Sequence, residues 1–77
     1  MKYAIISTEM AREAGINPRF HRTSKAGTEI IVNENELLKL GKPLGLDNKS
    51  MAEQLGGDGL LSRKEMRQRL LRWNNNY

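Results

Sequence analysis

The chain has 77 residues, no cysteine, one histidine and a formal net charge of +4 at pH 7. The lack of cysteine excludes disulfide bonds, cysteine-ligated zinc, iron–sulfur clusters and thiol nucleophiles. A chain of this length can build one hydrophobic core, and secreted domains this small usually carry disulfides, so we expect a cytoplasmic protein. The apolar run Tyr3–Ile6 is too short for a signal peptide or a membrane span, and we expect no membrane partner.

The charged residues are unevenly distributed along the chain. Residues 1–61 hold eight basic and eight acidic side chains and are neutral. The whole net charge therefore lies in residues 62–77, where Glu65 is the only acidic residue. The basic residues of this segment are Arg63, Lys64, Arg67, Arg69 and Arg72. Such an asymmetry indicates what kind of partner a protein binds rather than which fold it adopts.

The beginning of the chain predicts a strand followed by a short helix. Residues Lys2–Ser7 are dominated by β-branched and aromatic side chains, which favour a strand. Residues Thr8–Ala14 follow as a two-turn helix, with Thr8 as its capping residue and Gly15 as its end. A helix this short needs packing to persist. The residues expected to face inward are Met10, Ala11 and Ala14.

The stretch after Asn17 allows two interpretations. Residues Thr28–Val32 have the composition of a strand, and a short glycine-containing connection would pair them with Arg19–Ser24 in a hairpin. Alternatively, Pro18–Ala26 forms a helix that is capped by Asn17. Phe20 would be the only large apolar side chain of that helix, so the hairpin is favoured.

Helices are expected from residue 33 onward. Asn33–Glu36 has the spacing of a capping box and opens a helix that Gly41 ends. Residues Lys42–Asp47 form a connector to a second box, Ser50–Glu53, whose helix reaches Leu55.

The end of the chain predicts a turn and then the longest helix. Residues Gly56–Gly59 have the high backbone freedom of a turn. Ser62–Glu65 is a third capping box and opens a helix that ends near Trp73. The tail Asn74–Tyr77 is expected to be frayed.

Together these elements predict a single α+β domain over residues 1–77. It would combine a small antiparallel sheet of two or three short strands with three or four helices, the C-terminal helix being the longest. Residues 1–46 would supply the strand, helix and hairpin part, and residues 47–73 a two-helix part. The expected core residues are Ile5, Ile16, Ile30, Val32, Leu37, Leu40, Leu55, Leu61, Met66, Leu70 and Trp73.

The C-terminal helix carries the clearest pattern with a functional meaning. Met66, Leu70 and Trp73 recur at helical spacing and form one apolar stripe. The basic residues of this helix lie beside the stripe and spread over the remaining arc. In one interpretation they bind phosphates, because guanidinium groups donate paired hydrogen bonds and bound cations release counterions. In the other they form a solvated face or dock on an acidic protein groove.

Residues Met10–Ile16 resemble the first half of a helix-turn-helix, as found in bacterial repressors and excisionase-like proteins. The resemblance rests on Ala11, at the small position that lies against the second helix, and on Gly15 at the turn. The flanking apolar positions are matched by Met10, Ala14 and Ile16. The resemblance implies a recognition helix whose groove-facing residues would be Arg19, Arg22 and Lys25. His21 and Ser24 depart from its apolar pattern, and the alternative is a helix packed on a small sheet.

Residues Asp58–Glu65 resemble the second half of an EF-hand calcium loop. Gln54 and Gly56 stand at the first and third ligand positions and leave the loop short of charge and of oxygen ligands. Ser62 and Glu65 are already explained as a capping box. We therefore expect a turn at this place, and no metal or other cofactor.

Enzymatic chemistry has little support in the sequence. His21 is the only histidine, and no carboxylate lies near it in the sequence to orient it as a base. We expect a small non-enzymatic regulatory binding domain that contacts nucleic acid through its basic C-terminal helix. The alternative is a protein-interaction module, such as a phage or mobile-element accessory factor or inhibitor, that docks on another protein.

Overall fold

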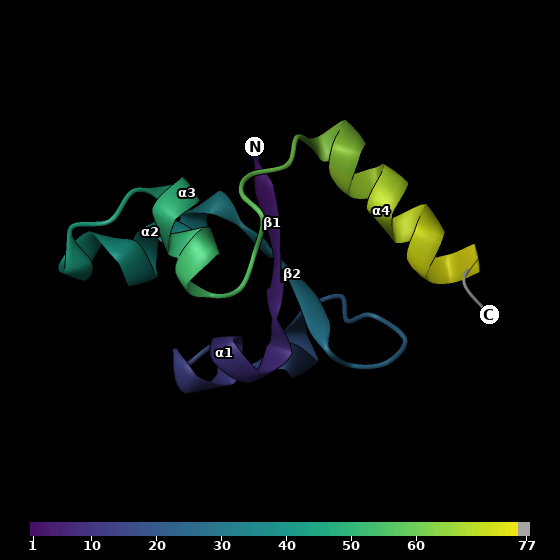
Figure 1. Cartoon of the computed structure of the whole chain (residues 1–77), viewed down its shortest axis with the longest axis horizontal. Helices are drawn as coiled ribbons and strands as arrows, with labels where there is room; N and C mark the ends of the chain where they lie inside the picture. Colours follow the sequence, from purple (N-terminus) through teal and green to yellow (C-terminus); the bar gives the residue numbers. More distant parts are fainter. Residues whose placement is uncertain (76–77) are drawn as a thin grey trace.

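A computed structural model describes residues 1–75 and confirms the α+β architecture, with a two-stranded antiparallel sheet among helices (Figure 1). In chain order the elements are β1 (Tyr3–Ser7), α1 (Thr8–Glu13), the 3-10 turn η1 (Pro18–Phe20), β2 (Glu29–Asn33), α2 (Glu34–Gly41), the 3-10 turn η2 (Lys42–Leu44), α3 (Asn48–Gln54) and α4 (Arg63–Asn75). At 13 residues α4 is the longest element, as predicted. It ends at Asn75, two residues past Trp73, so Asn74 and Asn75 of the expected frayed tail belong to the helix, and Asn76 and Tyr77 lie outside the described residues.

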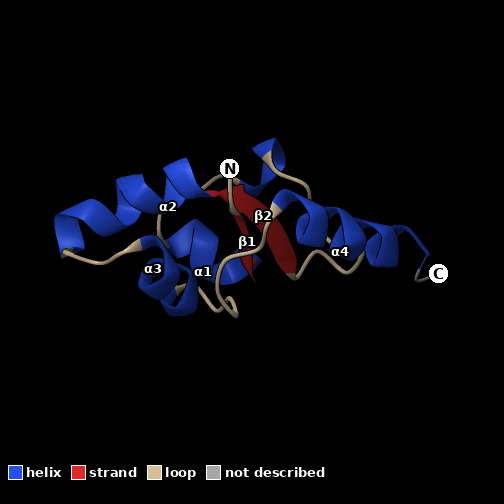
Figure 2. Cartoon of the chain, turned by 90° about the horizontal axis from the view of Figure 1, so that it is seen from above, coloured by secondary structure: helices blue, strands red, loops and turns tan. Residues whose placement is uncertain are grey.

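The inner face of the sheet forms the centre of the core. Ala4 lies opposite Val32 and Ile6 opposite Ile30, and all four side chains are at most 1% exposed. This face packs against α1, α2 and α3, which contribute Ala11, Leu37, Met51, Ala52 and Leu55. Seen from above, these three helices lie on one side of the sheet and α4 on the other (Figure 2). Of the expected core residues, Ile5, Ile16, Ile30, Val32, Leu37 and Leu55 are buried, and Leu40 is partly buried against them.

The outer face of the sheet is covered only in part by α4. It carries Ile5 opposite Ile31, and Ile31 lines a groove together with Met66 and Leu70 of α4. The expectation that the stripe Met66, Leu70 and Trp73 belongs to the core is wrong, because these residues are only half-buried, as is Leu61, another expected core residue. The reason is visible in Figure 1, where α4 slants away from β1 toward its C-terminal end. These side chains therefore line the space beneath the helix instead of filling the core.

The favoured hairpin between Arg19–Ser24 and Thr28–Val32 forms only in part, over Arg22–Ser24. β2 pairs along its whole length with β1, and Thr23 makes only an isolated bridge to Ile30. The alternative helix over Pro18–Ala26 is also absent from the described residues, apart from the single turn η1. The pairing with β1 is the longer one because both strands contribute buried aliphatic side chains, whereas Arg19–Ser24 offers Phe20 alone and pairs only briefly with the other edge of β2.

Two helices begin at residues other than the predicted caps. In α1 the hydroxyl of Ser7, not of Thr8, accepts a hydrogen bond from the Met10 amide at 3.3 Å. This start leaves Met10 exposed rather than inward, while Ala11 is buried and Ala14 half-buried. In α3 the carboxylate of Asp47 accepts from the Ser50 amide at 2.7 Å, so the helix starts before the predicted cap. In both cases the cap is the residue with extended backbone, as a capping residue requires.

Helix α2 begins and ends as predicted, from the cap Asn33 to Gly41. Asn33 and Glu36 form the predicted capping box, with both reciprocal hydrogen bonds present. Gly41 has a helical φ of −80°, and the chain continues through η2 to Gly45, whose φ is +70°. The Leu46 amide then donates to the Gly41 carbonyl at 3.0 Å, which closes η2 as a Schellman motif. The left-handed glycine of this region, Gly45, therefore ends η2, one turn beyond the end of α2.

Candidate nucleic-acid interface

Helix α4 starts at the capping box that the sequence predicts. The Ser62 hydroxyl accepts from the Glu65 amide at 3.2 Å, and the Glu65 carboxylate accepts from the Ser62 amide at 3.0 Å. The bond from the Ser62 amide, and to a smaller degree the Ser62 hydroxyl, lowers the pKa of Glu65 below its ordinary value. Glu65 is the only acidic residue of α4, and its carboxylate is hydrogen-bonded at the first turn of the helix. The charged residues on the rest of the helix are therefore all basic.

The five basic residues of α4 occupy two environments. Four of them are exposed to solvent: Arg63, Lys64, Arg67 and Arg72. Arg69 is half-buried and lines a small groove together with Glu29 and Asp58. Its side chain therefore lies near two carboxylates beside the sheet. We expect Arg69 to contribute less to the binding of a partner than the four exposed residues do.

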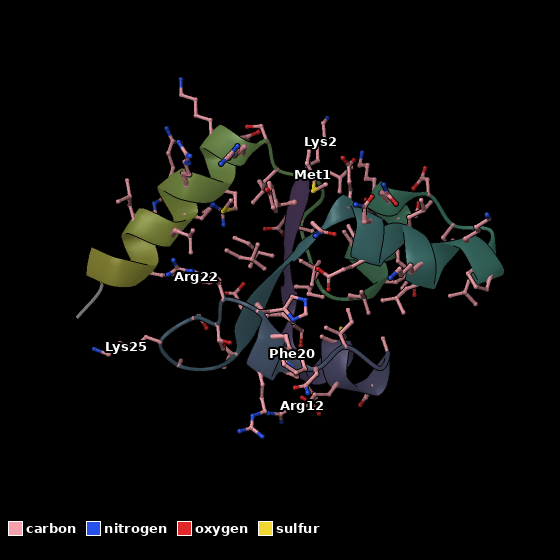
Figure 3. The ribbon with its side chains drawn as sticks, turned by 180° about the vertical axis from the view of Figure 1, so that it is seen from behind. Met1, Lys2, Arg12, Phe20, Arg22 and Lys25 are labelled. Atoms are coloured by element: carbon pink, nitrogen blue, oxygen red, sulfur yellow. The ribbon has the colours of Figure 1, made fainter. Side chains whose placement is uncertain are left out.

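A second basic segment runs along the free edge of β2. The Arg22 carbonyl accepts from the Ile31 amide at 3.0 Å, and the Ser24 amide donates to the Glu29 carbonyl at 2.9 Å. These bonds fix the backbone on both sides of Thr23. In Figure 3, Arg22 and Lys25 both lie on the same side of the sheet as α4, with Lys25 at the tip of the loop. Residues 14–28 contain three cations and no carboxylate, so the edge is basic throughout.

Two grooves join this edge to α4. One has a volume of about 270 Å³ and is lined by Phe20, His21 and Arg22 on one side and by Met66 and Leu70 on the other. The second, of about 380 Å³, lies between residues 24–29 and Trp73. The half-buried stripe of α4 thus lines both grooves on the side that faces the edge segment. The fold brings together Arg22, Lys25 and the basic helix, which are some 40 residues apart in the sequence.

The tertiary structure supplies His21 with the carboxylate that the local sequence lacks. Its Nδ1 lies 3.0 Å from the Asn17 carbonyl, and its Nε2 contacts a Glu36 carboxylate oxygen. The two contacts tie the end of η1 to the start of α2. The carboxylate that faces His21 thus comes from a residue distant in sequence, which the local sequence around His21 could not indicate.

The helix-turn-helix resemblance ends at Gly15. The described residues between Gly15 and β2 contain only the three-residue turn η1, so a recognition helix is absent from that part of the chain. Arg19, Arg22 and Lys25 lie on a turn and an edge segment, where they cannot enter a major groove as a helix would. Arg19 and Phe20 are both exposed on η1. Phe20 was not among the predicted site residues, although an aromatic residue between two arginines is a recognisable signal in the sequence.

The resemblance to a calcium loop corresponds to a turn in the structure. Residues 55–61 pass from α3 to α4, and the Tyr3 amide donates to the Leu61 carbonyl at 2.8 Å. Across residues 1–75, no three histidine, aspartate or glutamate side chains lie close enough together to hold a metal ion. Within the same residues, no helix has the length and apolar composition needed to cross a membrane.

Comparison with protein-family models, with curated proteins and with solved structures gave no match to this chain.

Proposed function

We propose that this domain is a non-enzymatic regulator that binds the phosphate backbone of nucleic acid through α4 and the basic edge beside β2. The observation that carries the proposal is the placement of charge on one face. Helix α4 exposes Arg63, Lys64, Arg67 and Arg72, its only carboxylate caps its own first turn, and Arg22 faces it across a groove. A polyanion on this face meets cations from two elements.

The chemistry of these groups suits phosphate. An arginine guanidinium can donate two parallel hydrogen bonds to phosphate oxygens, and each neutralised phosphate releases condensed counterions. Contacts of this kind do not depend on base sequence. Outside α4 and residues 14–28 the chain holds five basic and eight acidic residues, so attraction to a polyanion is directed to the face formed by α4 and the edge of β2.

The test is fluorescence anisotropy with labelled duplex DNA and single-stranded RNA at low and near-physiological salt. Affinity should fall log-linearly with salt, with a slope of about −0.7 to −0.9 per phosphate neutralised. The double charge reversal Arg63→Glu and Arg67→Glu should abolish binding at near-physiological salt. Both positions are exposed, so the far-ultraviolet circular dichroism of this variant should match that of the parent protein.

A matched control reverses the same number of charges elsewhere. Lys39 and Lys42 are exposed at the end of α2, on the opposite side of the sheet from α4 (Figure 1). Their reversal to glutamate should weaken binding only through net charge, and therefore far less. Equal losses in the two double variants would contradict the assignment of this face. Failure of the parent protein to bind at low salt would contradict nucleic-acid binding and favour a protein partner.

A further inference from the structure

We infer that Phe20 is a stacking platform for an unpaired base, so that the ligand of the proposed interface is single-stranded nucleic acid. This inference rests on the proposed function and deepens it. Phe20 is 82% exposed, more than any other large hydrophobic residue in the described part of the chain. Burying one face of an exposed ring against a base removes apolar surface of both partners from water.

The ring is presented on a rigid support. The Asn17 side chain accepts from the Arg19 amide at 3.0 Å, and the Phe20 amide donates to the Asn17 carbonyl at 3.2 Å. The His21 amide donates to the Pro18 carbonyl at 3.1 Å, and the His21 ring is held by Asn17 and Glu36. A platform that is already ordered loses little conformational entropy when a ligand binds.

The surroundings of the ring favour an anionic ligand. Arg19 precedes Phe20 and Arg22 follows it in the sequence, and both arginines are exposed. Residues 14–28 contain no acidic residue. The nearest carboxylate along the groove, Glu36, is engaged by His21 and by the Asn33 amide. An acidic apolar peptide would also meet cations here, but a planar base attached to a phosphate satisfies the aromatic face and the arginines together.

The groove connects the platform to the basic helix. Phe20 and Arg22 line the same groove of about 270 Å³ as Met66 and Leu70 of α4. A chain whose phosphates follow α4 can therefore place a base on Phe20. Paired bases in a duplex stack on one another and do not offer their faces to a side chain, so this contact selects single strands.

The experiment compares a labelled oligo(dT) strand of about ten nucleotides with a blunt duplex of the same length. Phe20→Ala should weaken oligo(dT) binding at least about five-fold and leave duplex binding unchanged. Phe20→Trp should retain the affinity for oligo(dT), and its fluorescence should be quenched on binding. Leu44→Ala is the matched control, because Leu44 is a 65%-exposed apolar residue on η2, and it should bind as the parent does.

The outcomes separate the two proposals. Unchanged oligo(dT) affinity in Phe20→Ala, or equal losses for single strand and duplex, would overturn the stacking platform while the parent's salt-dependent binding sustained the proposed function. Absence of binding by the parent to either probe would overturn both. Because Phe20 is exposed, Phe20→Ala should melt at the same temperature as the parent, so a loss of affinity cannot come from unfolding.

Discussion

His21 and Glu36 are 15 residues apart in sequence and in direct contact, with the imidazole held between the Glu36 carboxylate and the Asn17 carbonyl. The pair is partly buried, with side-chain exposures of 14% for His21 and 30% for Glu36. It joins the end of η1 to the start of α2, and only β2 lies between them along the chain. The same carboxylate also completes the capping box of α2. One contact therefore holds both the turn that presents Phe20 and the start of a core helix.

Removing this contact should destabilise the protein. We expect His21→Ala to lower the free energy of unfolding by about 1–3 kcal/mol, because it removes a charge-assisted hydrogen bond and leaves its partners unpaired. Glu36→Gln keeps an oxygen for the capping box and removes the negative charge that faces His21. A double-mutant cycle measured by urea denaturation should give a coupling energy between the two positions. Additive effects of the two substitutions would contradict a direct interaction.

Two adjacent leucines of α2 should differ sharply in their contribution to stability. Leu37 is 0% exposed in the core, whereas Leu38 is 51% exposed to solvent. Leu37→Ala should cost about 2–5 kcal/mol, since it removes buried methyl groups and leaves a cavity. Leu38→Ala should change stability by less than about 1 kcal/mol. Thermal unfolding of the two variants tests the orientation of α2, and similar melting temperatures would contradict it.

Position 57 has no space for a side chain, so glycine is required there. A Cβ atom at this position would lie 2.8 Å from the Ile5 carbonyl oxygen and 3.0 Å from that of Ala52. Both contacts are with backbone, so Gly57→Ala must separate β1 from α3, and we expect a loss of about 1–3 kcal/mol. Chemical denaturation would measure it, and a loss below about 0.5 kcal/mol would contradict the close approach.

Gly27 provides the contrasting control. It has a φ of +75° and nothing within 4 Å of an added Cβ, so the cost of substitution there comes from the backbone alone. Asparagine tolerates the left-handed conformation better than alanine does. Gly27→Asn should therefore be milder than Gly27→Ala, whereas Gly57→Asn should be at least as harmful as Gly57→Ala. The opposite order at either position would show that the reason given for that glycine is wrong.

Acid should weaken the starts of α3 and α4. The Ser50 amide, followed by the Ser50 hydroxyl, lowers the pKa of Asp47, and Ser62 acts in the same way on Glu65. A carboxylate with a lowered pKa in the folded protein stabilises it above the pKa of the unfolded chain, about 4. This contribution is lost as the pH falls through the lower folded-state values. Circular dichroism between neutral pH and about pH 2 should show the loss.

Amide substitutions can keep the capping hydrogen bonds while they remove the ionisable carboxylates. Asp47→Asn retains an oxygen that accepts from the Ser50 amide, and asparagine is as good a capping residue as aspartate. Glu65→Gln likewise retains an acceptor for the Ser62 amide. The double variant should show a flatter acid dependence of stability than the parent. An unchanged dependence would assign the acid sensitivity to other carboxylates.

Features governed by a few consecutive residues could be predicted from the sequence. The capping boxes at Asn33 and Ser62, the end of α1 at Gly15 and the strand at the start of the chain are all present. They depend on side chains that bond to backbone within one turn, or on β-branched composition. The uneven charge of the chain is likewise independent of the fold.

The tertiary structure decided everything that depends on contacts between distant segments. The pairing of β1 with β2 depends on burial of the inner face of the sheet by α1, α2 and α3, which are distributed along the chain. The proximity of Glu36 to His21, and of Phe20 to α4, could not be predicted from spacing because it depends on that pairing. Patterns within a few residues predict the caps, whereas the apolar surface buried over the whole chain decides which elements pack together. That burial also places the basic edge opposite α4.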